Sequence, residues 1–170
     1  VLITTALGAF RRDRYRRCYS EERPDARHDN LYKRTIDDGA IVLVSLSPEE
    51  RSFTGALVPL IKTLFQRTVL NRFALWRDDK LTNRTRPVAF VCDEYQEVAT
   101  QLSGSPVGDA TFFQMARQFG CLGIVASQSV STVVNALPGG DGQETPWKAI
   151  FATLGAALFF RSKDPETLKQ

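Results

Sequence analysis

The sequence has few cysteines, and their arrangement argues against a disulfide framework. Cys18, Cys92 and Cys121 are its three cysteines, and no two of them form a CxxC pair. An odd, scattered set of this kind is not typical of a disulfide-rich secreted domain. Because Cys92 and Cys121 fall in apolar runs, we expect them to be buried, reduced thiols, which favours a reducing compartment.

Long apolar runs are also missing. The longest candidates, such as AALFF at residues 156–160, have the length of a strand and not of a membrane span. The first residues, VLITTALGAF, carry no basic region ahead of their apolar part and no initiator Met, which is not the pattern of a signal peptide. We expect the chain to be cut from a longer one, because DPETLKQ at its end starts a helix and stops within about two turns.

The charge of the chain is small and identifies no class of partner, since the net value is +3. A content of 43% hydrophobic and 24% charged residues excludes a wholly disordered chain. Arginines do gather at residues 11–17, RRDRYRR. A solvated surface is the leading interpretation of this run, and contact with nucleic-acid phosphates is the alternative, which the acids that follow weaken. We interpret residues 1–35 as a polar, charged segment or part of an insertion.

Four short apolar runs predict strands, at residues 41–46, 88–92, 122–126 and 156–162. They are apolar throughout and do not alternate, which is typical of strands buried on both faces. Helical spacing predicts a helix over residues 57–73, with Pro59 in its first turn or at a kink. A second helix is predicted from residue 109 to Gly120, with Asp109 as its N-cap, and a last one opens at DPET.

The predicted helix over residues 57–73 has its apolar face at Leu57, Leu60, Ile61, Leu64, Phe65, Val69 and Phe73. Strands and helices alternate along the chain, except for a Gly-rich loop at residues 137–146. This order predicts an α/β fold in which helices cover both faces of a mostly parallel sheet.

Two adjacent carboxylates, Asp93 and Glu94, follow the strand VAFVC directly. Ligands of parallel α/β sheets bind outside the carboxyl ends of the strands. An apolar strand that ends in Asp-Glu is the Walker B pattern. In it the Asp orders a Mg²⁺ ion on the nucleotide phosphates, generally through water, and the Glu polarises a water for attack on the γ-phosphate. The alternative is that the two acids simply end a strand and begin a loop.

Two further residues fit the same chemistry. Gln128 follows the next strand, where an amide can read the γ-phosphate through water. Arg117, near the end of the intervening helix, is a candidate for stabilising transition-state charge on the nucleotide of a neighbouring subunit. The alternative for Arg117 is an ordinary surface arginine, favoured by the helix dipole near a C-terminus.

Together, VAFVCDEYQEVAT, FFQMARQFGCLGIVASQSVSTV and LFFRSKDPETLKQ resemble the TraG/TraD-type coupling proteins of type IV secretion systems. The resemblance covers residues 36–170 and is to the C-terminal part of the motor domain, the Walker B half that includes the TraM-recognition region. It implies a RecA-like P-loop ATPase that forms hexameric rings at the cytoplasmic face of the bacterial inner membrane. Such motors deliver DNA or protein substrates to the secretion channel in conjugation.

By matched position, the resemblance implies that Asp93 and Glu94 are the Walker B pair, with Asp93 on Mg²⁺ through water. It makes Gln128 the glutamine motif, which contacts ATP, and Arg117 the arginine finger. The implied cofactors are ATP and Mg²⁺. The implied partners are single-stranded DNA without sequence preference, a relaxase or secretion-system proteins, and further copies of the chain, with the membrane anchor outside this chain.

The sequence departs from the family in one important respect, because it contains no GxxxxGK[ST] motif to cradle the phosphates. We therefore do not expect this chain to hydrolyse ATP by itself. One alternative is another ring ATPase, either HerA/FtsK-like or a secretion-assembly ATPase, although Tyr95 and the DPET start favour coupling proteins. The other alternative is a non-catalytic module that keeps the fold and binds DNA or a partner protein.

Overall fold

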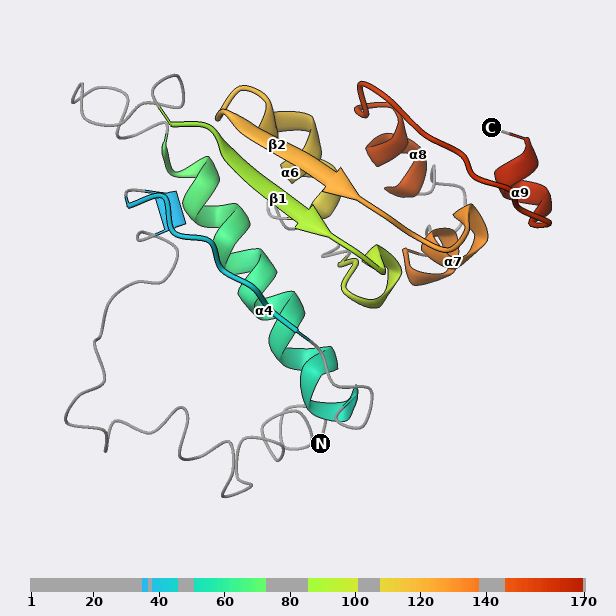
Figure 1. Cartoon of the computed structure of the whole chain (residues 1–170), viewed down its shortest axis with the longest axis horizontal. Helices are drawn as coiled ribbons and strands as arrows, with labels where there is room; N and C mark the ends of the chain where they lie inside the picture. The colour runs from blue at the N-terminus through green and yellow to red at the C-terminus, as the bar shows by residue number, and fades with distance from the viewer. Residues whose placement is uncertain are drawn as a thin grey trace. The chain divides into compact units, whose positions relative to one another are not determined.

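A computed structural model describes residues 35–36, 38–45, 51–72, 86–100, 108–137 and 146–169 (Figure 1). The chain divides within helix α4 into two units, residues 1–61 and residues 62–170. In chain order the elements are α4 (Arg51–Leu70), β1 (Val88–Cys92), the 3₁₀ helix η4 (Tyr95–Glu97), α6 (Asp109–Ala116), β2 (Cys121–Val125), α7 (Val130–Ala136), α8 (Pro146–Phe151) and α9 (Pro165–Leu168).

Strands β1 and β2 form a parallel pair, in register from Val88 opposite Cys121 to Cys92 opposite Val125. The strand predicted at residues 88–92 is confirmed, and the one predicted at 122–126 is confirmed with its bounds one residue earlier. Helix α6 makes the connection that a parallel pair needs. Because the strands are parallel, both of their carboxyl ends lie at one edge of the sheet, which Figure 1 shows at the arrowheads.

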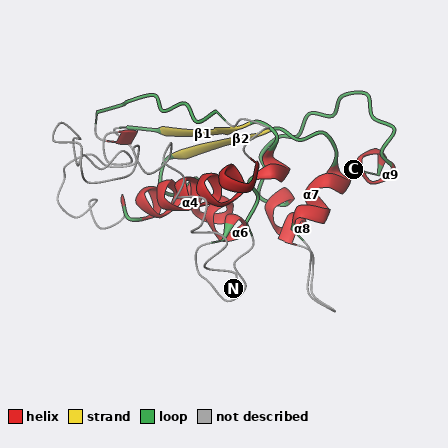
Figure 2. Ribbon diagram, turned by 90° about the horizontal axis from the view of Figure 1, so that it is seen from below, coloured by secondary structure: helices red, strands yellow, loops and turns green. Residues whose placement is uncertain are grey.

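One face of the sheet packs against helices through aromatic rings. The ring of Phe90 lies 5.9 Å from that of Phe65 in α4, and 6.2 and 6.3 Å from those of Phe112 and Phe113 in α6. Figure 2 shows both helices on the same side of the two strands. Aromatic pairs of this kind contribute about 0.5–1.5 kcal/mol each beyond the area they bury. These contacts fix the strands, and so the edge where they end, on the helical layer.

The opposite face of the sheet is apolar but open to solvent. Val91 of β1 and Leu122 and Ile124 of β2 are exposed there. Among the described residues of the second unit, helices cover one face of the sheet (Figure 2). The apolar residues on both faces explain why the sequence favoured strands buried on both sides, and a second helical layer stays a prediction.

The strands predicted at residues 41–46 and 156–162 are wrong over the residues that the structure describes. Residues 41–45 and 156–160 have no regular secondary structure, and Ile41 and Leu158 are 98% and 85% exposed. In the described ranges the sheet has two strands, which pair with each other. An apolar run becomes a strand only where a neighbour completes its backbone hydrogen bonds, and neither run has such a neighbour among the described residues.

Helix α4 differs from its prediction in its start and in its buried face. It begins at Arg51, so Pro59 lies inside the helix and not in its first turn. In the second unit, its buried side chains are Lys62, Gln66 and Val69, whereas the predicted core residue Leu64 is exposed. The spacing of these three residues still matches one helical face, but two of them are polar.

No helix among the described residues has the length and apolar character that a membrane crossing requires.

Candidate nucleotide-side edge of the sheet

The predicted site residues lie where the two strands end. The pairing of β1 with β2 continues past the strands, since the amide of Ala126 donates to the carbonyl of Cys92 at 2.9 Å. The amide of Tyr95 then donates to the carbonyl of Ala126, also at 2.9 Å. These bonds hold Asp93 and Glu94 next to the segment that carries Gln128.

Glu94 and Gln128 are in direct contact. The side-chain amide of Gln128 donates to both carboxylate oxygens of Glu94, at 3.0 Å each. The amide of Gln96 donates to Oε2 of the same carboxylate, and its own oxygen accepts a bond of 2.7 Å from the hydroxyl of Ser127. All four residues come from the two strand ends and η4. The carboxylate is therefore oriented by amide donors while it remains exposed to solvent.

The backbone of Glu94 is in the left-handed region, with φ 50° and ψ 46°. Among the described residues it is the one non-glycine residue with a positive φ. Such a conformation costs a residue with a side chain roughly 1–2 kcal/mol. It persists only where the surroundings impose it, and outliers of this kind gather at functional sites.

Asp93 is exposed, and its Oδ1 accepts a bond of 2.9 Å from the amide of Glu94. No group of three or more His, Cys, Asp or Glu residues that could hold a metal ion occurs in the described ranges. The role predicted for Asp93 needs no such group, because Mg²⁺ in nucleotide sites keeps several waters and takes one or two carboxylates. Contact with Mg²⁺ stays a prediction.

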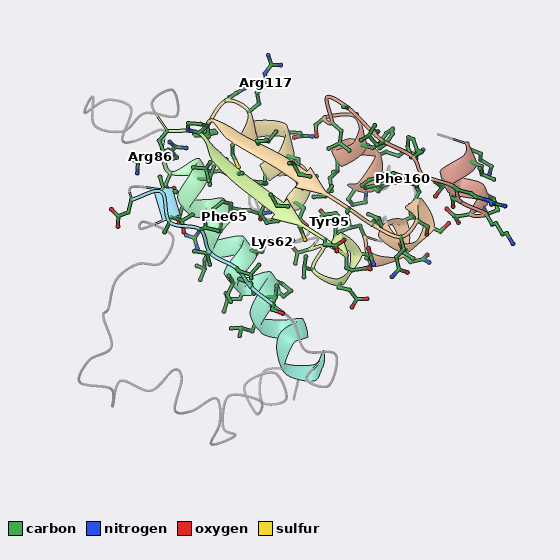
Figure 3. All side chains as sticks on the ribbon, viewed as in Figure 1. Lys62, Phe65, Arg86, Tyr95, Arg117 and Phe160 are labelled. Atoms are coloured by element: carbon green, nitrogen blue, oxygen red, sulfur yellow. The ribbon has the colours of Figure 1, made fainter. Side chains whose placement is uncertain are left out.

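Arg117 lies at the other end of the sheet. It is the exposed C-cap of α6, four residues ahead of β2, whereas Gln128 follows that strand. Figure 3 shows its side chain directed away from the ribbon, at the opposite end of the strands from Tyr95. The structure thus brings together Asp93, Glu94 and Gln128, and it does not bring Arg117 to them within one chain.

A buried polar cluster under η4 was missed by sequence reasoning. The prediction that Asp109 is an N-cap is wrong, because Gly108 holds that position and Asp109 is the first residue of α6. The Asp109 carboxylate is buried and accepts bonds from Lys62 at 2.5 and 2.7 Å, from Gln66 at 2.8 Å and from the Tyr95 hydroxyl at 2.8 Å. The backbone amide of Thr100 also donates to it, at 2.9 Å.

Burial governs the protonation of this cluster. Loss of solvent lowers the pKa of Lys62, and the carboxylate of Asp109 opposes that change. Burial, followed by the negative charge of Asp109, raises the pKa of Tyr95, so its hydroxyl stays protonated and donates. Burial also raises the pKa of Cys92 to about 11, which keeps this thiol uncharged at the end of β1.

The segment after Gln128 is tied to the last described helix. Ser129 caps α7 by accepting from the amide of Thr132, and Asp164 caps α9 by accepting from the amide of Thr167. Asp164 also accepts from the Ser131 hydroxyl at 2.6 Å. These hydrogen bonds, with Ser131 first, lower the pKa of Asp164 to about 2. The DPET start is therefore connected to α7, the helix that begins two residues after Gln128.

Comparison with known proteins gives no match for this chain among family models, curated proteins or solved structures.

Proposed function

We propose that this chain is the Walker B half of a hexameric, ATP-driven motor of the TraG/TraD coupling type. In this proposal the motor works at the cytoplasmic face of a bacterial inner membrane and passes single-stranded DNA or protein to a type IV secretion channel. The observation that carries the proposal is the contact between Glu94 and Gln128 at the shared carboxyl edge of two parallel strands. A strand-end acid with a purely structural role would not need an amide from the next strand.

The geometry supports a division of labour between the two acids. The exposed carboxylate of Glu94, oriented by Gln96 and Gln128, is placed to accept a proton from water. Asp93 projects from the neighbouring position, where a water of hydrated Mg²⁺ can contact it. ATP with Mg²⁺ would supply the phosphate and the charge neutralisation that the reaction needs.

Gln128 gives the site a means to sense the nucleotide. Its amide donates to Glu94 in this structure and is also a donor suited to phosphate oxygens. An exchange of partners would act on the loop after β2, and helix α7, which follows that loop, is bonded through Ser131 to Asp164. The site is thereby connected to a segment beyond it.

The first test uses the natural full-length protein and measures ATP hydrolysis with and without single-stranded DNA, comparing wild type with Glu94→Gln. We expect DNA to stimulate the wild type and the variant to lose roughly 10²–10⁴-fold in kcat while it still binds nucleotide, because it lacks the base. Glu97→Gln is the matched control, since it makes the same change of charge three residues away in η4.

Three results would contradict the proposal. Normal turnover by Glu94→Gln would remove the Walker B assignment. A wild type that binds DNA or a partner protein but hydrolyses no ATP would favour the non-catalytic module. ATP turnover that depends on Glu94 but does not respond to DNA would favour a secretion-assembly ATPase.

A further inference from the structure

We propose that the buried cluster of Lys62, Asp109 and the Tyr95 hydroxyl is a positioning device that holds Glu94 in its working conformation. The inference rests on the proposed function, because it assigns the cluster to the same site. It extends that function to residues of α4 and α6 that the Walker B pattern does not contain. None of the three is a catalytic residue, since each acts on Glu94 through the chain that follows it.

The backbone of Tyr95 is fixed on the end of β2. Its amide donates to the Ala126 carbonyl at 2.9 Å, and its own carbonyl accepts from Val98 at 3.1 Å and from Ala99 at 2.9 Å. The bond to Ala126 sets the direction of the peptide between Glu94 and Tyr95. Together with the peptide before Glu94, this peptide defines the left-handed backbone of that residue, φ 50° and ψ 46°.

The side chain of Tyr95 is fixed at its far end. The residue is fully buried, its ring lies edge-on to Phe113 at 6.1 Å, and its hydroxyl donates to Asp109 Oδ2 at 2.8 Å. Tyr95 therefore links the strand-end backbone to the first residue of α6. Figure 3 shows Tyr95 and Lys62 together near the carboxyl end of β1.

Lys62 of α4 is the third member of the cluster. Its ammonium group contacts both oxygens of Asp109 and also donates to the carbonyl of Val98 at 2.6 Å and to the hydroxyl of Thr100 at 3.0 Å. The segment from Tyr95 to Thr100 is thus held at both ends by one ion pair. The ion pair thus acts together with the bond from Tyr95 to Ala126 in setting where η4 lies relative to the strands.

Stability alone does not account for an ion pair in this place. The side chains of Lys62 and Asp109 are 3% and 0% exposed. Replacing such a pair with apolar residues of similar size is often neutral or stabilising, because removing two charges from water offsets their attraction. An apolar pair has no hydrogen-bond donors or acceptors. Here Lys62 donates to Val98 and Thr100, and Asp109 accepts from Tyr95.

The test compares three variants of the full-length protein. Tyr95→Phe keeps the ring and removes the bond to Asp109. Gln66→Leu is the matched control, because it also removes one donor to Asp109, and that donor comes from α4 and not from the segment after Glu94. The double variant Lys62→Met/Asp109→Leu removes the ion pair without leaving an isolated buried charge.

We expect Tyr95→Phe and the double variant to lose roughly 10- to 100-fold in kcat, the loss that follows a small misplacement of a catalytic group, with an unchanged KM for ATP. Their amides at residues 94–98 should exchange with solvent faster than in wild type. Gln66→Leu should keep both kcat and this protection. The double variant should lose activity even where its Tm equals that of wild type, which a merely structural role does not predict.

The outcomes separate the two proposals. Wild-type kcat in Tyr95→Phe, or losses that follow Tm equally in all three variants, would overturn the positioning role while the ATPase function stands. Faster exchange confined to Tyr95→Phe and the double variant, in a protein whose wild type does not hydrolyse ATP, would support the hold on Glu94 and overturn the proposed function.

Discussion

Glu94 and Asp109 are carboxylates 15 positions apart whose surroundings give them opposite tasks. Glu94 is exposed and accepts bonds from neutral amides, so its carboxylate remains accessible to water. Asp109 is 1% exposed, and an ammonium group contacts both of its oxygens. The chemistry of an acid is therefore set by its neighbours in space, and the residue type alone does not reveal it.

Gly123 is the residue that sets the distance between β2 and α6. A Cβ built on it would lie 2.7 Å from Cε1 of Phe113, so the ring would have to move. We expect Gly123→Ala to destabilise the protein by about 1–3 kcal/mol, as overpacking of a filled core does. Thermal unfolding checks this prediction. Gly155→Ala is the control, because a Cβ there meets nothing within 4 Å, and an equal Tm for both variants would contradict the reasoning.

The residues at the strand ends could be predicted from the sequence, whereas the buried polar cluster could not, and the difference has a physical reason. Asp93, Glu94 and Gln128 follow apolar strands, and parallel strands bring such residues to one edge without further information. Lys62 and Asp109 are 47 positions apart, and each is locally indistinguishable from a surface lysine or a helix cap. The available signal was a pair of polar residues, Lys62 and Gln66, on one face of α4. Such a pair indicates a buried polar cluster only once an acid is known to lie beside it.

At the scale of elements, the first half of α4 contains residues that disfavour a helix. Pro59 lies in its interior and has no amide hydrogen, so the carbonyl of Gly55, four residues earlier, lacks its helical donor. Gly55 is itself a weak helix former. The first half of α4 is therefore weaker than its 20-residue length implies.

We expect Pro59→Ala to stabilise α4 by about 1–3 kcal/mol, because it restores a hydrogen bond and removes a steric conflict. Circular dichroism should show higher helix content and a higher Tm. Thr63→Ala, a few positions along the same helix, changes intrinsic propensity alone and should raise stability by roughly 0.5 kcal/mol. If the two variants gave the same gain, the proline would not be the source of the weakness.

The elements that could be predicted are those whose partners are close in the sequence. β1, α6 and β2 follow one another within one parallel unit, and their apolar patterns correspond to the structure. Residues 41–45 and 156–160 have an equally apolar pattern but no pairing strand among the described residues. Periodicity reports which side chains favour burial, whereas a strand also requires hydrogen bonds from another segment.

At the scale of the whole molecule, the sheet has two strands within the described ranges, which is few for its apolar content. Sheets normally need three or more strands, or helices packed on them, to be stable in water. The exposed face formed by Val91, Leu122 and Ile124 is where a RecA-like fold would place its second layer of helices. That architecture remains a prediction. The parallel pair and the helical layer of the described residues are compatible with it.

The position of Arg117 means that its predicted role depends on the assembly of several subunits. It is exposed ahead of β2, whereas Glu94 and Gln128 lie at the carboxyl ends of the strands, so in the proposed motor its action on ATP would be on a neighbour's site. If the proposed hexamer forms, we expect Arg117→Ala to lower kcat of the full-length protein by roughly 10³-fold or more, as for arginine fingers. Arg161→Ala, which also removes an exposed arginine, should leave kcat unchanged.

Mixed rings decide whether Arg117 acts across the subunit interface or is an ordinary surface residue. Subunits with Arg117→Ala keep Glu94, and subunits with Glu94→Gln keep Arg117, so an interface between the two kinds combines an intact base with an intact arginine. If the arginine acts across the interface, mixing the two inactive variants should restore part of the turnover, in proportion to the number of such interfaces. Inactive mixed rings, or a monomer in which Arg117→Ala retains full activity, would remove Arg117 from the site and leave it a surface residue at the end of α6.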